Sequence, residues 1–179
     1  TSRIITNVSE SITEMLGAML ELVPMPLETP YHHARRLRGI PDTFSVGRYH
    51  KIVNRLAQRG FLEKIEKQGQ EFIRLTKEGR LEVLCAKIVK RAKQPWDRKW
   101  RVVIFDIPEV AHRTRDELRR FLKHTGFVKL QASVYITPYA LSQESVVYSN
   151  LSGFQKYIRF LRGDTCDDDE ALRDHFHLT

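Results

Sequence analysis

The sequence predicts an α+β protein built from two modest domains. A chain of 179 residues, 41% of them hydrophobic, is long enough for one sizeable core or two small ones. Its apolar pattern changes from helices followed by a hairpin in the first half to strands alternating with helices in the second. Residues 1–99 hold 19 Lys and Arg against 11 Asp and Glu, a net charge of +8, whereas residues 100–179 hold 11 of each. A basic half joined to a neutral one is typical of a protein whose first half meets nucleic acid, although a generally basic soluble domain has the same charge.

Composition argues against several other classes of protein. No apolar run approaches the ~20 residues of a membrane-spanning helix, and the first residues lack the apolar core of a signal peptide, so we expect a cytoplasmic protein without membrane contact. The two cysteines, Cys85 and Cys166, have no CxxC spacing. This argues against a zinc ribbon and gives no disulfide framework.

Two helices are predicted at the start of the chain, over residues 8–23 and 33–39. In the first, apolar residues recur at three- and four-residue spacing, which indicates one buried stripe. Three prolines between Pro24 and Pro30 prevent this helix from continuing. Gly39 and Pro41 close the second helix, which is short and basic.

A third helix, over residues 44–59, is the most informative element of the first half. Its apolar residues fall on one face, and the opposite side carries polar residues. Arg and Lys side chains pair well with guanine edges, and Asn and Gln with adenine. The candidate DNA-binding residues on this helix are Arg48, Lys51, Asn54, Arg55 and Gln58.

A hairpin follows, with strands over 61–67 and 72–75 and a turn at residues 68–70, and then a helix over 81–90. Helix, helix, basic helix and hairpin are the order of a winged helix-turn-helix, which we assign to residues 1–92. Lys67 then lies at the wing tip and is a sixth candidate DNA contact. Glu63, Glu66 and Glu71 would meet phosphates unfavourably if they faced DNA. The alternative is that the polar face of the third helix is simply solvated.

The second half begins after a polar linker, residues 93–99. Residues 102–105 are four consecutive β-branched or aromatic residues, which predicts a strand covered on both faces. Asp106 follows where Pro108 ends the strand, so we expect its carboxylate at the strand exit, partly in water. The Asp106 carboxylate either stabilises a turn or binds a ligand.

The remaining elements are a helix over 109–125 with its arginines pointing outward, strands over 127–131 and 133–137, a helix over 141–151 and a strand over 157–162. Together with the first strand they predict a ferredoxin-like βαββαβ domain over residues 100–163. A small antiparallel sheet with open edges and one uncovered face is expected to form a homodimer by sheet-to-sheet contact. Residues 164–179 read as a solvated acidic tail with a short helix.

The motifs of residues 96–139 resemble the central domain of PaaX-type transcriptional repressors of phenylacetate degradation. The resemblance rests on Trp100, Phe105-Asp-Ile-Pro108, the helix over 113–119, Thr125-Gly-Phe127 and Ser133-Val-Tyr-Ile-Thr-Pro138. That domain is itself similar to the small ferredoxin-fold nuclease of CRISPR spacer acquisition. The chain resembles a hybrid of the two, because the CRISPR protein has no DNA-reading domain in front.

The resemblance implies roles for two residues. Asp106 matches the strand-end aspartate of the CRISPR family, and Ser133 lies within the matching second-strand motif, Gln131-Ala-Ser-Val-Tyr135. Two copies of Asp106 across a two-fold axis would bind Mg²⁺ or Mn²⁺, and Ser133 would contact a phosphate or tune the metal site. A turn-forming aspartate and an ordinary strand serine are the alternatives. PaaX repressors carry a further C-terminal domain with no counterpart in these residues, so a small-molecule effector is doubtful.

Two functions therefore compete. In the first, the protein is a homodimeric regulator that binds double-stranded DNA through the third helix. In the second, it is a divalent-metal-dependent DNA endonuclease with Asp106 and Ser133 as catalytic residues, and the winged helix only localises the substrate.

Overall fold

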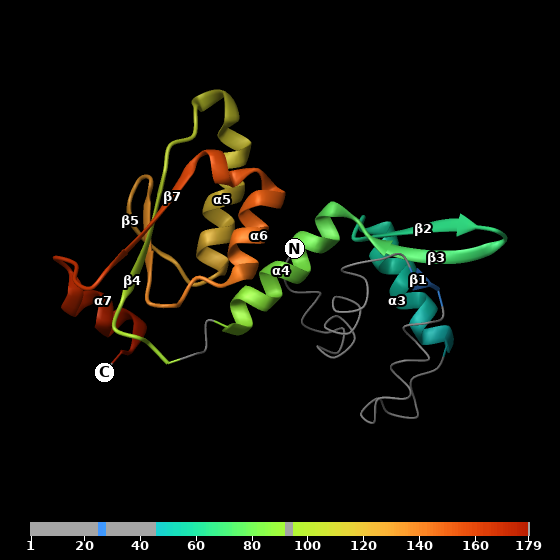
Figure 1. Cartoon of the computed structure of the whole chain (residues 1–179), viewed down its shortest axis with the longest axis horizontal. Helices are drawn as coiled ribbons and strands as arrows, with labels where there is room; N and C mark the ends of the chain where they lie inside the picture. Colours follow the sequence, from blue (N-terminus) through green and yellow to red (C-terminus); the bar gives the residue numbers. More distant parts are fainter. Residues whose placement is uncertain (1–24, 28–45, 92–94, 179) are drawn as a thin grey trace. The chain divides into compact units, whose positions relative to one another are not determined.

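The computed structural model describes residues 25–27, 46–91 and 95–178, and the chain divides into two compact units, residues 1–83 and 84–179 (Figure 1). The division falls within one helix, α4 (Lys77–Arg91). The helices predicted over 8–23 and 33–39 lie outside the described residues. Each unit has its own hydrophobic core.

The N-terminal unit contains the predicted basic helix, α3 (Val46–Gln58), and the predicted hairpin, β2 (Leu62–Lys67) and β3 (Gln70–Leu75). The two strands pair antiparallel from Leu62 opposite Leu75 to Lys67 opposite Gln70. Gln68 and Gly69 form the two-residue turn, both with positive φ, 52° and 74°. This is the backbone of the tight hairpin turns in which glycine is favoured.

A strand that the sequence did not predict, β1 (Met25–Pro26), pairs with β3 and makes the sheet order β1-β3-β2. The prolines of this segment were interpreted only as helix breakers. Proline lacks an N–H but is tolerated on an edge strand, where that position faces away from the ladder. The chain continues with Leu27 buried and its N–H bonded to the carbonyl of Glu71 at 2.9 Å.

The core of this unit forms where α3 packs on the sheet. Tyr49 and Val53 are fully buried, as their helical spacing predicted, and they lie in one cluster with Leu27 and Ile73. The Tyr49 hydroxyl donates a 2.7 Å hydrogen bond to the carbonyl of Leu27. A buried hydroxyl would otherwise cost about 1–3 kcal/mol, so this bond makes the position suitable for tyrosine.

α4 begins one turn earlier than the predicted helix over 81–90. Its first turn is capped by Thr76, whose Oγ1 accepts a hydrogen bond from the N–H of Gly79 at 3.0 Å. This position requires a glycine because the backbone of Phe61 passes directly over the turn. A Cβ atom there would lie 2.0 Å from the Phe61 carbonyl oxygen. The glycine therefore allows the helix and the hairpin to approach closely.

The C-terminal unit follows the predicted order of strands and helices. It contains β4 (Trp100–Phe105), α5 (His112–His124), β5 (Val128–Gln131), β6 (Val134–Thr137), α6 (Gln143–Ser152) and β7 (Ile158–Gly163). Two 3₁₀ turns, Glu109–Ala111 and Phe154–Lys156, precede α5 and β7. All strand pairs are antiparallel, in the order β5-β6-β4-β7. This is the split βαβ arrangement that the sequence predicted for this half.

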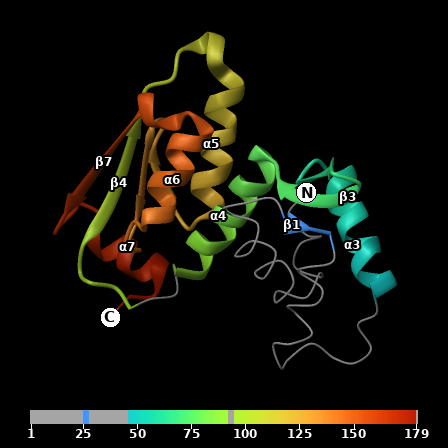
Figure 2. The ribbon, with the colours of Figure 1, turned by 45° about the vertical axis from the view of Figure 1, so that its right-hand side comes forward.

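One face of the sheet is covered by α5 and α6 (Figure 2). Val103 and Phe105 of β4 point to this face and pack against Leu118 and Leu122 of α5, all four at most 3% exposed. The predicted inner stripe of α5 is confirmed for these two leucines. Phe121 is only partly buried and stacks on Tyr148 of α6, with ring centroids 3.9 Å apart.

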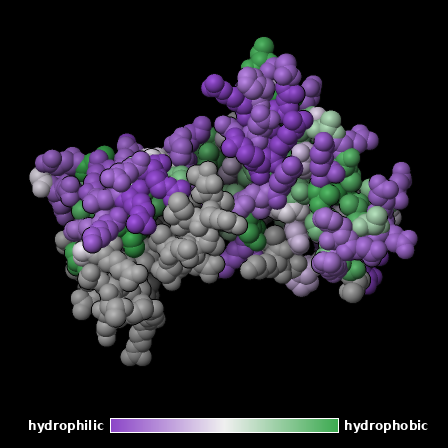
Figure 3. Space-filling model, turned by 180° about the vertical axis from the view of Figure 1, so that it is seen from behind, coloured by the Kyte–Doolittle hydropathy of each residue, from purple (hydrophilic) through white to green (hydrophobic). Residues whose placement is uncertain are grey.

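The prediction that β4 is covered on both faces holds for Trp100 and Val102 but not for Ile104. Ile104 is 39% exposed, and Leu161 on the neighbouring strand β7 is 53% exposed. Both belong to the face opposite the helices, because their neighbours Val103 and Phe160 point the other way. Apolar atoms gather over this sheet, surrounded by hydrophilic ones, in the rear view of Figure 3. On this face, Val102 packs against a second hydrophobic cluster, whereas Ile104 remains on an uncovered surface.

The other half of this face is covered by α7 (Asp169–Phe176), which packs through Leu172 and Phe176 on Trp100 and Ile136. The prediction that residues 164–170 form a solvated tail was wrong at Asp169, whereas Asp164 is 78% exposed. Asp169 accepts a 2.6 Å hydrogen bond from the Trp100 indole and pairs with Arg173 at 2.7 Å. Asp164 pairs with Lys99 at 3.2 Å.

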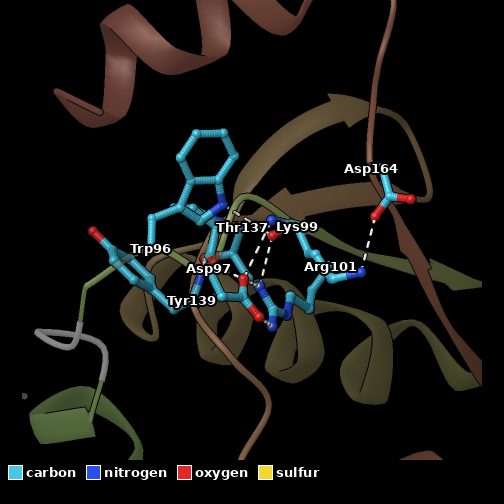
Figure 4. Close-up of polar contacts among 8 residues, drawn as sticks. Trp96, Asp97, Lys99, Arg101, Thr137, Tyr139 and Asp164 are labelled. Carbon is cyan, nitrogen blue, oxygen red and sulfur yellow. Dashed lines mark hydrogen bonds and ion pairs between the residues drawn. The ribbon is translucent and has the colours of Figure 1, made fainter. Parts of the chain in front are cut away.

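The end of the linker is attached to the sheet by Arg101 (Figure 4). This side chain is only 7% exposed, and its two terminal nitrogens bind the two carboxylate oxygens of Asp97 at 2.5 Å. Nη1 also donates to the carbonyls of Lys99 and Pro138, at 2.6 and 3.0 Å. A buried guanidinium requires such partners, so this network fixes where the chain enters β4.

Candidate nucleic-acid interface

The polar face of α3 is accessible to solvent along its length. Lys51, Asn54, Arg55 and Gln58 are all exposed, while Tyr49 and Val53 are buried on the other side. The helix contains no acidic residue in its first turn and has Arg55 in its last. The fifth candidate on this helix, Arg48, lies within α3, but its side chain is outside the described part of the structure.

These four exposed side chains supply two kinds of contact. Lys51 and Arg55 lie one turn apart and supply two positive charges that can pair with phosphates or guanine. Asn54 and Gln58 lie one turn apart on the same side and supply amide groups that can bind adenine. The helix therefore presents cationic and amide groups together, without an intervening carboxylate.

The hairpin tip presents one of the predicted contacts. Lys67 is exposed at the end of β2, beside the turn. Next to it, Glu66 lies directly opposite Glu71 in the ladder, and both are exposed. Two like charges in a cross-strand pair repel each other and also repel phosphate. The tip is therefore a weaker candidate than α3.

The third hairpin carboxylate is neutralised within the hairpin itself. Glu63 lies opposite Arg74 and accepts a hydrogen bond from its Nε. This bond holds the pKa of Glu63 below its usual range. Glu63 therefore stays ionised but paired, and it adds little net negative charge at this surface.

Asp106 and Ser133 lie at the same end of the four-stranded sheet. Asp106 directly follows β4, and its side chain is exposed, as predicted. Its N–H donates a 3.0 Å hydrogen bond to the carbonyl of Tyr157, while the N–H of Phe105 donates one to the carbonyl of Ser133, also at 3.0 Å. Ser133 was predicted within a strand, but it lies in the turn between β5 and β6 and is partly buried.

Two arginines near this end of the sheet are less exposed than the sequence predicted. Arg115 donates to Glu109 at 2.5 Å, and Arg119 donates to the carbonyl of Ala132 at 3.2 Å, in the turn next to Ser133. The bond from Arg115 holds the pKa of Glu109 below its usual range. The prediction that both arginines point outward was wrong, because each side chain hydrogen-bonds to a neighbouring segment of the chain.

The outer face of α5 carries charges of both signs. Arg113, Arg120 and Lys123 are exposed, but so are Asp116 and Glu117 between them. Alternating charges are typical of a solvated helix face. This favours the solvated alternative over a second nucleic-acid surface on α5.

A metal ion at Asp106 would need further ligands from outside the described residues of one chain. Within residues 25–27, 46–91 and 95–178, no three His, Cys, Asp or Glu side chains group closely enough to hold a metal ion. One carboxylate with water ligands can contribute to a Mg²⁺ site but does not form one. A second Asp106 from another copy of the chain remains the arrangement that the resemblance implies.

The side-chain contacts at this end of the sheet were not predicted from the sequence. Arg119 reaches the turn before β6, and Glu109 reaches Arg115 from the 3₁₀ turn before α5. The only local signal was that Arg115 and Arg119 are one helical turn apart. Their acceptors lie six and thirteen residues away, in segments that only the folded chain brings near.

Comparison with protein families finds a match to the model described as the PaaX protein central Cas2-like domain, over residues 93–174. The matched segment includes the whole four-stranded sheet with α5 and α6. A comparison with curated proteins finds no match. In the described part of the chain, no helix is both long enough and apolar enough to cross a membrane.

Proposed function

We propose that this protein is a PaaX-like transcriptional regulator that binds double-stranded DNA as a homodimer. The match of residues 93–174 to the PaaX central domain supports the regulator class. The observation that carries DNA binding is the solvent-exposed face of α3, where Lys51, Asn54, Arg55 and Gln58 lie together. Placed in a major groove, this face would pair its cations with phosphates and guanine and its amides with adenine.

Support for the winged helix comes from the part of the motif that the structure describes. α3 packs on a sheet that contains the β2–β3 hairpin, in the order expected for a recognition helix followed by a wing. The helices predicted over 8–23 and 33–39 would complete the motif. In this proposal α3 makes the main contact and Lys67 an accessory one, because Glu66 and Glu71 weaken the tip.

The uncovered half of the four-stranded sheet supports homodimerisation. Ile104, at 39% exposure, and Leu161, at 53%, present apolar side chains on this face. Arg159 is cross-strand neighbour to Ile104 and contributes a positive charge beside them. Association with a second copy would remove the apolar side chains from water, at roughly 25 cal/mol per Å² of apolar area buried. A two-fold dimer would also present two copies of α3 to a palindromic site.

The deciding experiment measures binding of the purified protein to double-stranded DNA in the absence of divalent metal. A library of random duplexes is selected for binding, and the enriched sequence is titrated against a scrambled duplex of equal length. Regulator function requires the enriched duplex to bind more tightly, with an inverted repeat in its sequence. Equal affinity for the two duplexes at every salt concentration would contradict the proposal.

The nuclease alternative is carried by one observation, the exposed Asp106 carboxylate beside the Ser133 turn. It needs a second Asp106 in a dimer and Mg²⁺ or Mn²⁺, which could activate water for attack on a phosphate. The two functions are not exclusive, since DNA binding resides in the N-terminal unit.

A further inference from the structure

A small cavity lies inside the C-terminal unit, between the sheet and the helices that cover it. Its volume is about 30 Å³. The lining is mainly apolar and comes from α5, α6, β4 and β7, and includes Phe121, Phe127, Phe154 and Phe160. No acidic or basic side chain lines it among the described residues.

One polar group in this cavity has no partner. Ser149 of α6 is 5% exposed and lines the cavity, and its Oγ has no hydrogen-bond partner among the described residues. Burial of a hydroxyl without a hydrogen bond costs about 1–3 kcal/mol. The other buried hydroxyls of the lining have partners within the protein. Thr125 donates to the carbonyl of Phe121 and Thr137 to that of Gly126, and the Oγ of Ser145 lies 3.4 Å from the Oγ of Ser142. The Ser149 hydroxyl is therefore available to hydrogen-bond a molecule in the cavity.

We propose that this cavity binds a small, uncharged, largely apolar molecule that carries one hydroxyl group, of the alcohol or phenol class. The apolar lining would bury its hydrocarbon part, and Ser149 would hydrogen-bond its hydroxyl. A carboxylate or phosphate is excluded, because the charge would be buried without a countercharge. The inference concerns the C-terminal unit and does not depend on DNA binding.

The size of the cavity determines how a ligand enters. A volume of about 30 Å³ holds roughly two water molecules, so a larger molecule must displace a side chain. Phe160 is the candidate gate, because it lines the cavity, is 40% exposed and belongs to the edge strand β7. Ile88 of α4 also lines the cavity. α4 carries Val83 into the core of the N-terminal unit, so a bound molecule contacts a helix that contributes to both units.

Binding is tested on the full chain with phenol, benzene and benzoate, by calorimetry and by the ¹³C-methyl NMR signals of Ile88 and Ile158. Phenol is expected to bind and shift both signals, benzene to bind more weakly, and benzoate not to bind. Failure of phenol to shift either signal, or binding of benzoate as tight as that of phenol, would overturn the proposal. These comparisons use the unmodified protein and need no variant to fold.

The role of the hydroxyl is tested with Ser149→Ala. This variant should bind phenol roughly three- to tenfold more weakly, the effect of one hydrogen bond, and should bind benzene as before. Ser152→Ala is the matched control, because Ser152 lies on the same helix but donates to the carbonyl of Tyr148 at 2.8 Å and does not line the cavity. Unchanged phenol affinity in Ser149→Ala would refute the assignment of Ser149.

Discussion

The indole N–H of Trp100 donates a 2.6 Å hydrogen bond to Oδ1 of Asp169, and this contact joins the first strand of the C-terminal unit to its last helix. Trp96 packs beside Trp100 with ring centroids 5.1 Å apart, and the guanidinium of Arg173 lies 5.1 Å from the centre of the Trp96 ring. The chain has two tryptophans, and both lie at this junction. Tryptophan fluorescence therefore reports directly on the docking of α7.

Replacement of Asp169 by alanine should loosen α7. The variant leaves the N–H of Trp100, a residue only 1% exposed, without its acceptor, and it removes the partner of Arg173. We expect a loss of about 1–3 kcal/mol in the free energy of unfolding and a red shift in tryptophan emission. Urea unfolding followed by fluorescence measures both. Asp167→Ala, at an exposed position of the same acidic segment, should change neither, and an equal red shift there would contradict the assignment.

The Asp97–Arg101 pair should make stability depend on pH in the acid range. Hydrogen bonds from Arg101 hold the pKa of Asp97 below its usual value of 3.8. The pair therefore contributes stability that is fully present above the unfolded pKa and is lost as the pH falls through the lower folded pKa. Since the Asp97 side chain is 49% exposed, solvent screening limits this contribution to the order of 1 kcal/mol.

Asp97→Asn tests this dependence. The free energy of unfolding should fall at neutral pH, and the difference from the unmodified protein should shrink as the pH drops below about 3.8. Other carboxylates titrate in both proteins, so the difference isolates Asp97. Asp164→Asn is the control, because its exposed pair with Lys99 is expected to contribute little. A difference that stays constant with pH would argue against the pair.

Removal of single charges on α3 should weaken DNA binding in a salt-dependent way. For Lys51→Ala and Arg55→Ala we expect weaker binding and a reduction of roughly one in the slope of log affinity against log salt, if each contacts a phosphate. Arg80→Ala, at an exposed position on α4, is the matched control. A loss of DNA affinity in Arg80→Ala equal to that in the α3 variants would mean that binding depends only on the net charge of the protein.

A second arginine on the uncovered sheet face, in addition to Arg159, should prevent association of two copies. We expect Leu161→Arg to shift the protein from dimer to monomer in sedimentation velocity, because the arginine would face the apolar side chains of its partner. Val110→Arg controls for added charge, since Val110 is 94% exposed in the turn before α5. A dimer that survives Leu161→Arg, or a monomeric unmodified protein, would rule out this face as the interface.

Asp106→Ala separates the two functions. DNA binding without metal should be unchanged, because Asp106 lies in the C-terminal unit and α3 in the other. Plasmid nicking is then compared with and without Mn²⁺ for both proteins. Mn²⁺-dependent nicking that disappears in Asp106→Ala would establish the nuclease, whereas nicking by both proteins would point to another site or a contaminant.

Local patterns in the sequence determined much of the secondary structure. The four-residue spacing of Tyr49 and Val53 predicted the buried side of α3, and the polar residues on the opposite face predicted its exposed side. The βαββαβ order and the exposed position of Asp106 also followed from neighbouring residues. Helical and strand periodicity is set by backbone geometry within a few residues, so it can be read without knowledge of the fold.

Contacts between distant residues could not be predicted in this way. Pro26 joins a sheet because β3 offers it an edge, and Gly79 is required because Phe61 passes over its turn. Asp169 looked like part of a solvated tail until the fold placed Trp100 beside it, 69 residues away.

The sequence by itself determined most of the described helices and strands and the polar, positively charged face of α3. The tertiary structure decided which part of the four-stranded sheet stays exposed to solvent and which carboxylates accept hydrogen bonds from other side chains. Burial and hydrogen bonding depend on partners that only folding brings together.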